Sequence, residues 1–187
     1  MVTTGLRRSK LVAAGIIRAK RNPTTGRITM ALFYAADFAD QLENLILPSL
    51  RNGYVVLCDR FIYTLKARAA VRGLDRDWAE GLYGISLQPD LVICLRVAPE
   101  ISLERELRLR HQLDFWESGR DMGLSPDPVH SFLEYQRRIG QELERQAAEQ
   151  GFVVVDGNGP VDEVYPQILA RVENLLGSLA REPRGRS

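Results

Sequence analysis

The sequence is poor in the residues that build disulfide frameworks and metal centres. Of its 187 residues only two are cysteine, Cys58 and Cys94, and only two are histidine, His111 and His130. Each cysteine stands in an apolar, strand-like run, which is typical of a reduced core residue in a cytosolic protein. We therefore expect a cytoplasmic location. The two histidines are too few and too scattered to indicate a metal site.

Long apolar runs and an excess of either charge are missing too. No apolar run approaches the roughly 20 residues that a membrane-spanning helix needs, and the first residues resemble neither a signal peptide nor a transit peptide. Lysine and arginine number 25 against 24 aspartate and glutamate, a net charge of +1. A nearly neutral chain has no overall positive electrostatic field to attract nucleic acid or an anionic membrane, so we expect neither as a partner.

What the sequence does contain is an alternation of strand-like and helix-like segments. Apolar runs bounded by turn residues predict strands at 2–4, 54–58, 91–95 and 152–155. Helices are predicted at 9–20, 28–50, 61–73, 75–83, 99–110, 128–150 and 161–179. This alternation predicts an α/β fold with a parallel sheet flanked by helices, in one domain over residues 1–180. A disordered tail is expected at 181–187.

An acid and a base, Asp59 and Arg60, directly follow the apolar run 54–58. In an open α/β sheet, ligands bind beyond the carboxyl ends of the strands. A carboxylate beside a guanidinium suits a metal–phosphate site there, because the carboxylate can face the metal while the guanidinium forks onto phosphate oxygens. A surface ion pair at the end of a strand explains the same two residues equally well.

Other segments allow a functional and a structural interpretation. The basic loop 5–9 follows the first strand and would suit phosphate, although a solvated loop is the simpler interpretation. Ser9 is expected to cap a helix that buries Leu11 and Ile16. The helix 28–50 is apolar on more than one side, which suggests the sheet on one side and a second subunit on another. Its aromatic stripe is more often core than ligand site. The apolar residues of 111–127 follow neither a helical nor a strand periodicity, and this segment is predicted to be mobile and lid-like.

Taken in order, the short motifs resemble the thymidylate kinase family. They are Leu32-Phe33-Tyr34-Ala35-Ala36-Asp37 in the long helix, Asp59-Arg60-Phe61, Pro89-Asp90-Leu91-Val92, Pro99-Glu100 followed by Glu104-Arg105, and Phe132 with Tyr135. The resemblance extends to about residue 179. It implies a three-layer P-loop nucleotide kinase fold and a homodimer packed through helix 28–50. It also implies transfer of the γ-phosphoryl group of ATP, with Mg²⁺, to a deoxynucleoside monophosphate such as dTMP.

The same resemblance implies roles for individual residues. Asp59 would lie near Mg²⁺ and the phosphates, Arg60 would bind the acceptor monophosphate, and Tyr34 would stack on its base. Further acceptor-side candidates are Arg7, Arg8, Phe38, Thr64 and Arg68. On the ATP side, Arg105 and Arg110, and less closely Arg120, match arginines of the family's lid. Arginines there would neutralise charge on the transferring group, which is the main catalytic need in phosphoryl transfer.

The sequence departs from the family pattern in four places. It has no G-x-x-x-x-G-K-S/T phosphate loop, so we expect a chain that begins one strand and one helix late and has little activity alone. A protein that begins upstream of Met1 explains this better than a strand borrowed from a partner or a degenerate remnant. Strands 54–58 and 91–95 would then lack their shared neighbour. The loop 5–9 has lost the family's acid, and Phe38 and Arg68-Ala69 replace base-reading residues, which puts thymidylate specificity in doubt.

Three functions follow from these residues. The first is a nucleoside monophosphate kinase. The second is a non-catalytic, nucleotide-binding or regulatory member of the family, which the arginine-rich loop and the lost acid favour. The third is a nucleic-acid binder, the weakest of the three because the basic residues are spread along a nearly neutral chain.

Overall fold

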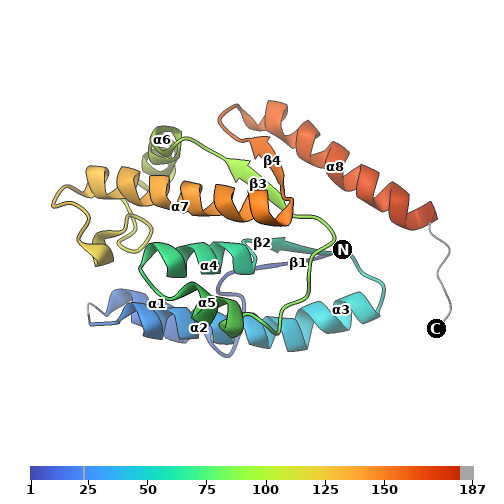
Figure 1. The fold of residues 1–187 in the computed structure, drawn as a ribbon, viewed down its shortest axis with the longest axis horizontal. Coiled ribbons are helices and arrows are strands. Elements are labelled where there is room, and N and C mark those ends of the chain that lie inside the picture. The colour runs from blue at the N-terminus through green and yellow to red at the C-terminus, as the bar shows by residue number, and fades with distance from the viewer. Residues whose placement is uncertain (23, 182–187) are drawn as a thin grey trace. The chain divides into compact units, whose positions relative to one another are not determined.

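The computed structural model describes residues 1–22 and 24–181 and has the predicted α/β class, with parallel strands flanked by helices (Figure 1). Its contacts divide the chain into two compact units, Met1–Leu87 and Gln88–Ser187. The boundary falls between the second and third strands. Residues 182–187 of the expected disordered tail lie outside the described residues.

The first unit is built on two parallel strands. Strand β1 (Val2–Gly5) pairs with β2 (Val56–Asp59), in register from Val2 opposite Val56 to Gly5 opposite Asp59. Around them lie α1 (Ala13–Arg21), α2 (Arg27–Gln41), η1 (Leu42–Ile46), α3 (Leu47–Arg51), α4 (Ile62–Val71) and α5 (Arg76–Leu82). Helix α2 packs against α1 and α4, and α4 packs against α5. Helix α2 also contacts the carboxyl end of β1, where Thr4 bonds Gln41 and Arg7 bonds Asp37.

The long helix predicted at 28–50 is confirmed as the continuous run α2–η1–α3. Its middle turn, η1, widens to a π-helix just before Pro48. Proline has no N–H to donate to the preceding turn, which explains a local change in the hydrogen-bond pattern there. The helix predicted from Ser9 instead begins at Ala13. Leu11 is 80% exposed and does not belong to a buried face, whereas Ile16 is fully buried.

The second unit repeats the plan with longer helices. Strands β3 (Ile93–Arg96) and β4 (Val153–Asp156) are parallel, with Ile93 opposite Val153. The helical segments are α6 (Pro99–Arg110), η2 (Arg120–Met122), α7 (Pro128–Gln150) and α8 (Val161–Arg181). Helix α7 packs against α6 and β3, and α8 against β4. The Asp127 carboxylate accepts two N–H bonds at the start of α7, and Gly151, with φ of 70°, ends it.

The segment predicted as a mobile lid, 111–127, is docked on α7 in the structure. Ser118 is fully buried, and its carbonyl accepts a 2.8 Å hydrogen bond from the Ser131 hydroxyl. Gln136 donates to the carbonyl of Glu117 at 2.9 Å. Gly119 has φ of 64°, and a Cβ there would lie 2.7 Å from Cβ of Tyr135. A glycine is therefore needed for the close approach of this segment to α7.

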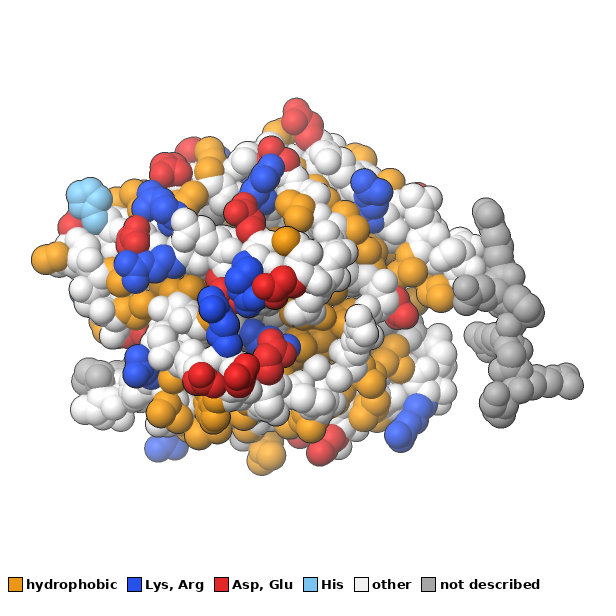
Figure 2. Space-filling model, viewed as in Figure 1, with side chains coloured by type: hydrophobic (Ala, Val, Ile, Leu, Met, Phe, Trp, Pro, Cys, Tyr) orange, Lys and Arg blue, Asp and Glu red, His pale blue; other side chains and the backbone are white. Residues whose placement is uncertain are grey.

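Among the described residues, β2 pairs only with β1 and β3 only with β4. The parallel pairing predicted from the sequence is thus confirmed within each pair, and the strands at 54–58 and 91–95 share no neighbour. Leu57 and Leu95 on these strands remain about half exposed. Acidic and basic side chains lie interspersed on the face drawn in Figure 2. None of the described helices combines the length and hydropathy needed to cross a membrane.

Candidate functional site

The carboxyl ends of β1 and β2 lie against each other in the first unit. Gly5 and Asp59 are register partners, and a Cβ on Gly5 would lie 2.7 Å from the Asp59 carbonyl oxygen. Beyond these ends, Arg7 and Arg60 both have φ of 62°. A non-glycine residue rarely adopts this left-handed conformation, and such strain is commonly found at functional sites. The expected position of Asp59 and Arg60 at a strand end is confirmed.

The loop 5–9 is held from behind by a buried carboxylate on α2. Asp37 Oδ2 accepts the N–H of Arg7 at 2.7 Å, and Oδ1 accepts the N–H of Ser9 at 2.9 Å. Gln41 donates to the same carboxylate at 3.0 Å and accepts a hydrogen bond from the Thr4 hydroxyl. Burial raises the pKa of Asp37, and the two backbone N–H bonds limit the rise. These contacts fix the backbone on both sides of the arginine pair.

The arginine side chains of this loop face solvent. Arg7 and Arg8 are exposed, and no described residue forms an ion pair or hydrogen bond with either guanidinium. Arg60 lines a small pocket with Gly5, Asp37, Phe38 and further residues of the same unit. The cavity volume of this pocket is about 20 Å³, room for about one water molecule. This cavity is therefore too small to enclose a nucleotide.

Aromatic rings form the wall next to the pocket. Phe38 meets Phe61 edge-on at a centroid distance of 5.4 Å and Tyr83 at 6.0 Å. Burial raises the pKa of the Tyr83 hydroxyl strongly. Tyr34 is only 8% exposed, and the Arg68 guanidinium carbon lies 5.9 Å from its ring centroid. Arg68 therefore has to share the ring with a base or move aside if Tyr34 is to stack on one.

Thr64, the remaining acceptor-side candidate, lies half-buried on α4, three residues after Phe61. Its N–H bonds the Phe61 carbonyl at 3.2 Å and so closes the first turn of the helix. Neither Thr64 nor Asp59 lines the pocket that contains Arg60. A ligand that touches all three therefore extends beyond the pocket.

In the second unit, the ATP-side candidates differ in how their guanidinium groups are used. Arg105 donates to the carbonyls of Gly157, Asn158 and Gly159 at 2.8, 2.8 and 2.9 Å. Arg110 lies 3.2 Å from a carboxylate oxygen of Glu106, and Arg120 lies 5.4 Å from the ring centroid of Phe115. The guanidinium of Arg105 thus forms hydrogen bonds with the loop after β4, whereas Arg110 and Arg120 are largely exposed.

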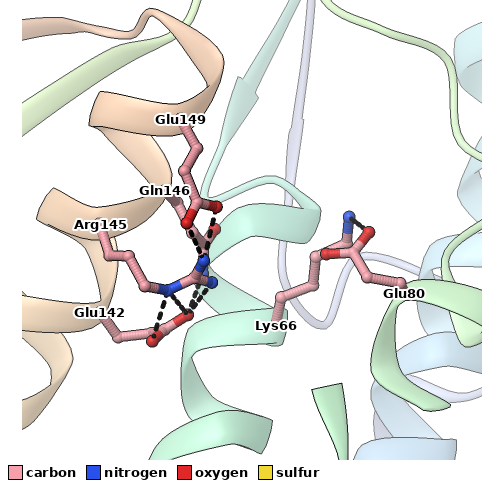
Figure 3. A network of polar contacts seen from close by, with 6 residues as sticks. All are labelled: Lys66, Glu80, Glu142, Arg145, Gln146 and Glu149. Atoms are coloured by element: carbon pink, nitrogen blue, oxygen red, sulfur yellow. Dashed lines mark hydrogen bonds and ion pairs between the residues drawn. The ribbon is translucent and has the colours of Figure 1, made fainter. Parts of the chain in front are cut away.

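Two further charged clusters are formed by other residues of the two units. On α7, Arg145 bonds the carboxylates of Glu142 and Glu149, which raises the pKa of its guanidinium (Figure 3). In the first unit, the ammonium of Lys66 lies 2.5 Å from a carboxylate oxygen of Glu80 (Figure 3). These pairs satisfy charges within their own units, and we assign them no role in ligand binding.

A metal ion at the strand ends would rely on few protein ligands. Among residues 1–22 and 24–181, no three His, Cys, Asp or Glu side chains gather in a group that could hold an ion. Asp59 is a single exposed carboxylate. Magnesium commonly uses one or two carboxylates together with phosphate oxygens and water, so Asp59 fits an ion that arrives with a nucleotide.

Comparison with protein families matches residues 11–168 to the family described as thymidylate kinase. The chain belongs to the thymidylate kinase family. A protein named probable thymidylate kinase 2 from Saccharolobus solfataricus is 40% identical over 155 residues, covering 82% of this chain and 72% of that protein. The thymidylate kinase of Pelobacter propionicus is 32% identical over 164 residues, covering 84% and 72%. The probable thymidylate kinase of Staphylothermus marinus is 29% identical over 152 residues, covering 81% and 69%.

The family resemblance read from the motifs is thus confirmed, and the thymidylate kinase family uses ATP as phosphoryl donor. Sequence reasoning placed Asp37 only in a family motif and did not find its bonds to the loop 5–9. One signal was available, because an acid within the apolar stretch 32–38 requires buried donors. The contacts of Arg105 left no such signal, since its partners are backbone carbonyls more than 50 positions away.

Proposed function

We propose that the chain acts as a nucleoside monophosphate kinase of the thymidylate kinase family in the cytoplasm. The reaction transfers the γ-phosphoryl group of ATP to a deoxynucleoside monophosphate such as dTMP. The first unit holds the acceptor phosphate at the ends of β1 and β2. This placement is supported by three arginines, Arg7, Arg8 and Arg60, that follow the two paired strand ends.

The observation that carries the proposal is the pair of exposed guanidinium groups on a fixed loop. Arg7 and Arg8 have no acidic partner among the described residues, so their charge is available to an anion. A guanidinium presents a planar fork of donors that matches phosphate oxygens. Phe38 and Phe61 line the same pocket as Arg60 and are proposed to provide an apolar surface for a base.

On the donor side, Asp59 would hold Mg²⁺ together with the phosphate oxygens. This ion would neutralise charge on the phosphates during transfer. In the second unit, Arg110 and Arg120 are proposed as ATP-binding residues, since both are exposed. Arg105 is proposed to support the loop 157–159 rather than to contact the transferring phosphate, because that loop uses its donors.

The experiment is a calorimetric titration of the full chain with dTMP, dCMP and inorganic phosphate, followed by an assay of radiolabelled phosphoryl transfer from ATP. We expect the monophosphates to bind and Arg60→Ala to weaken them by roughly 10- to 100-fold, the loss of one or two charged hydrogen bonds. Arg51→Ala removes the same charge from the end of α3 and should have no effect. If the wild-type chain bound none of the three ligands, the proposal would be wrong.

A non-catalytic, nucleotide-binding role is the second candidate. It is favoured by one observation, the three hydrogen bonds that the Arg105 guanidinium donates to carbonyls of its own unit. Binding of dTMP without any ADP formed from ATP, at every enzyme concentration, would support this role over the kinase. Formation of dTDP in step with ADP would exclude it.

We also propose that the helix 28–50 packs in a homodimer. Ile28 and Leu32, one turn apart on α2, are 54% and 48% exposed. Two exposed apolar side chains on one helix face favour a protein partner. Leu32→Glu should convert a dimer to a monomer in sedimentation velocity, while Leu87→Glu, an equally drastic change elsewhere in the unit, should not. A wild-type chain that sediments as a monomer at all concentrations would contradict this.

A further inference from the structure

The carboxylate of Asp37 is the most deeply buried charged group of the chain's described part, with 1% of its surface exposed. None of the proposed steps uses it as a ligand. Both of its oxygens already accept hydrogen bonds: Oδ2 from the N–H of Arg7 and from Gln41, and Oδ1 from the N–H of Ser9. A group so occupied cannot donate to an anion, and its negative charge would repel one. Its contribution has to come through the loop that it holds.

The loop itself is shaped by these bonds. Arg7 adopts φ of 62°, a conformation that residues with a Cβ avoid, and its N–H is the donor in the shorter of the two backbone bonds to Asp37. Two residues later, the Ser9 hydroxyl accepts the N–H groups of Leu11 and Val12 at 3.1 Å each. The backbone of the loop is therefore turned toward α2, while the side chains of Arg7 and Arg8 remain in solvent.

We propose that Asp37 is a positioning residue for phosphate recognition, which holds the loop 5–9 in the strained form that presents Arg7 and Arg8. The inference rests on the proposed function, that a monophosphate binds at these strand ends. A loop fixed before binding loses less conformational entropy when the ligand arrives, so the affinity for the anion rises. Asp37 thus raises the affinity for phosphate without touching it.

The test is a double-mutant cycle on the full chain, with dTMP and inorganic phosphate as titrants. Asp37→Asn keeps the size of the side chain but replaces one acceptor oxygen by an N–H₂ group, which faces a backbone N–H. We expect it to weaken both ligands by about 10-fold. In the background Arg7→Ala plus Arg8→Ala, we expect the same change to weaken them by less than about 2-fold, because its effect passes through the arginines.

Asp40→Asn is the matched control. It lies three residues further along α2, removes the same charge and leaves the loop contacts in place, since Asp40 pairs with Asn44. We expect it to leave the affinity unchanged. If Asp37→Asn weakened phosphate equally in both backgrounds, or if Asp40→Asn matched its effect, the positioning role would be wrong although the ligand still bound. Failure of the wild-type chain to bind either ligand would instead overturn the proposed function and this inference with it.

Asp37→Asn is a buried substitution that can impair folding, and a second measurement on the wild-type chain avoids this. Hydrogen exchange of the Arg7 and Ser9 amides is compared without ligand and with saturating inorganic phosphate. A positioned loop has both amides protected before the ligand is added, with little further change. Amides that become protected only when phosphate binds would show that the ligand orders the loop, and the inference would be wrong.

Discussion

In the first unit a carboxylate holds the backbone of a strand-end loop, whereas in the second unit a guanidinium does. Asp37 accepts N–H groups of the loop after β1, and Arg105 donates to carbonyls of the loop after β4. Both loops follow strands of a parallel pair, and both contain a glycine at a close approach, Gly5 and Gly157. The architecture is shared, but the charge that anchors each loop is opposite.

The difference decides which charges remain for a ligand. An acid anchors the first loop, and no residue in the described part of the chain bonds the guanidinium groups of Arg7 and Arg8. In the second unit the arginine is itself the anchor, so its donors are used inside the fold. The position of an arginine near a strand end is therefore a poor guide to its function. What matters is whether backbone carbonyls or a ligand take its hydrogen bonds.

The largest difference between the units is expected when a methyl group is added to the two glycines. Gly5→Ala brings a Cβ within 2.7 Å of a backbone carbonyl of Asp59, which cannot move without separating the strands. We expect a loss of about 1–3 kcal/mol in the free energy of unfolding of the first unit. Gly157→Ala meets a methyl group of Val97 at 2.8 Å, and this side chain can rotate. The loss there should stay below about 1 kcal/mol.

Each unit carries one tryptophan, Trp78 in the first and Trp116 in the second, so urea unfolding can be followed separately by fluorescence. Unfolding of the first unit is followed in a Trp116→Phe background and unfolding of the second in a Trp78→Phe background. The reference for each glycine variant is the chain with the same tryptophan replacement and the native glycine. Equal losses for the two glycine variants would remove the distinction between a rigid and an adaptable strand end.

An intermediate effect is expected when the anchor of the second unit is removed. Arg105→Ala leaves three carbonyls without their charged donor, and water can reach part of this loop. We therefore expect a loss of about 1–2 kcal/mol in stability, read from Trp116, and no change in dTMP affinity. Arg108→Ala, an exposed position on the same helix, is the control. A variant that kept full stability but lost nucleotide turnover would assign Arg105 to catalysis.

The smallest effect is a pH dependence of the first unit. Since burial raises the pKa of Asp37 above its unfolded value, its contribution to stability is fully present below the unfolded pKa and is lost as pH rises through the folded pKa. The stability of the wild-type chain relative to Asp37→Asn should therefore fall as pH rises from about 4, near the ordinary pKa of aspartate. Unfolding in urea between pH 4 and 7 measures it. If the stability of the wild-type chain relative to Asp37→Asn increased with pH, the N–H bonds to Asp37 would lower its pKa more than burial raises it.

The sequence predicted the elements better than the contacts. The apolar run 54–58 predicted β2 within two residues, with Asp59 and Arg60 at its end, because aromatic and β-branched residues favour strands. None of residues 54–58 is fully buried, so the run predicted the strand but not its exposure. Ser9 has the right residue type for a cap, yet the helix starts at Ala13. The N–H of Ser9 binds Asp37, and residues 10–12 form a turn. That bond joins positions 28 apart, and local pattern does not encode it.

The same limit applies to the side chains of the site. Tyr34 has the aromatic ring that stacking on a base requires, but only the folded chain brings Arg68 over that ring. Residue type and spacing identify which groups can meet a nucleotide. They do not show which of these groups the fold has already used for its own stability.

The arginine Nε–Hε signals of the ¹⁵N-labelled full chain, assigned through single Arg→Lys variants, report which arginines meet the ligand during a titration with dTMP. We expect the signals of Arg7, Arg8 and Arg60 to shift with ligand concentration while that of Arg105 stays in place. A shift of Arg105 with Arg7 and Arg8 unmoved would contradict this expectation.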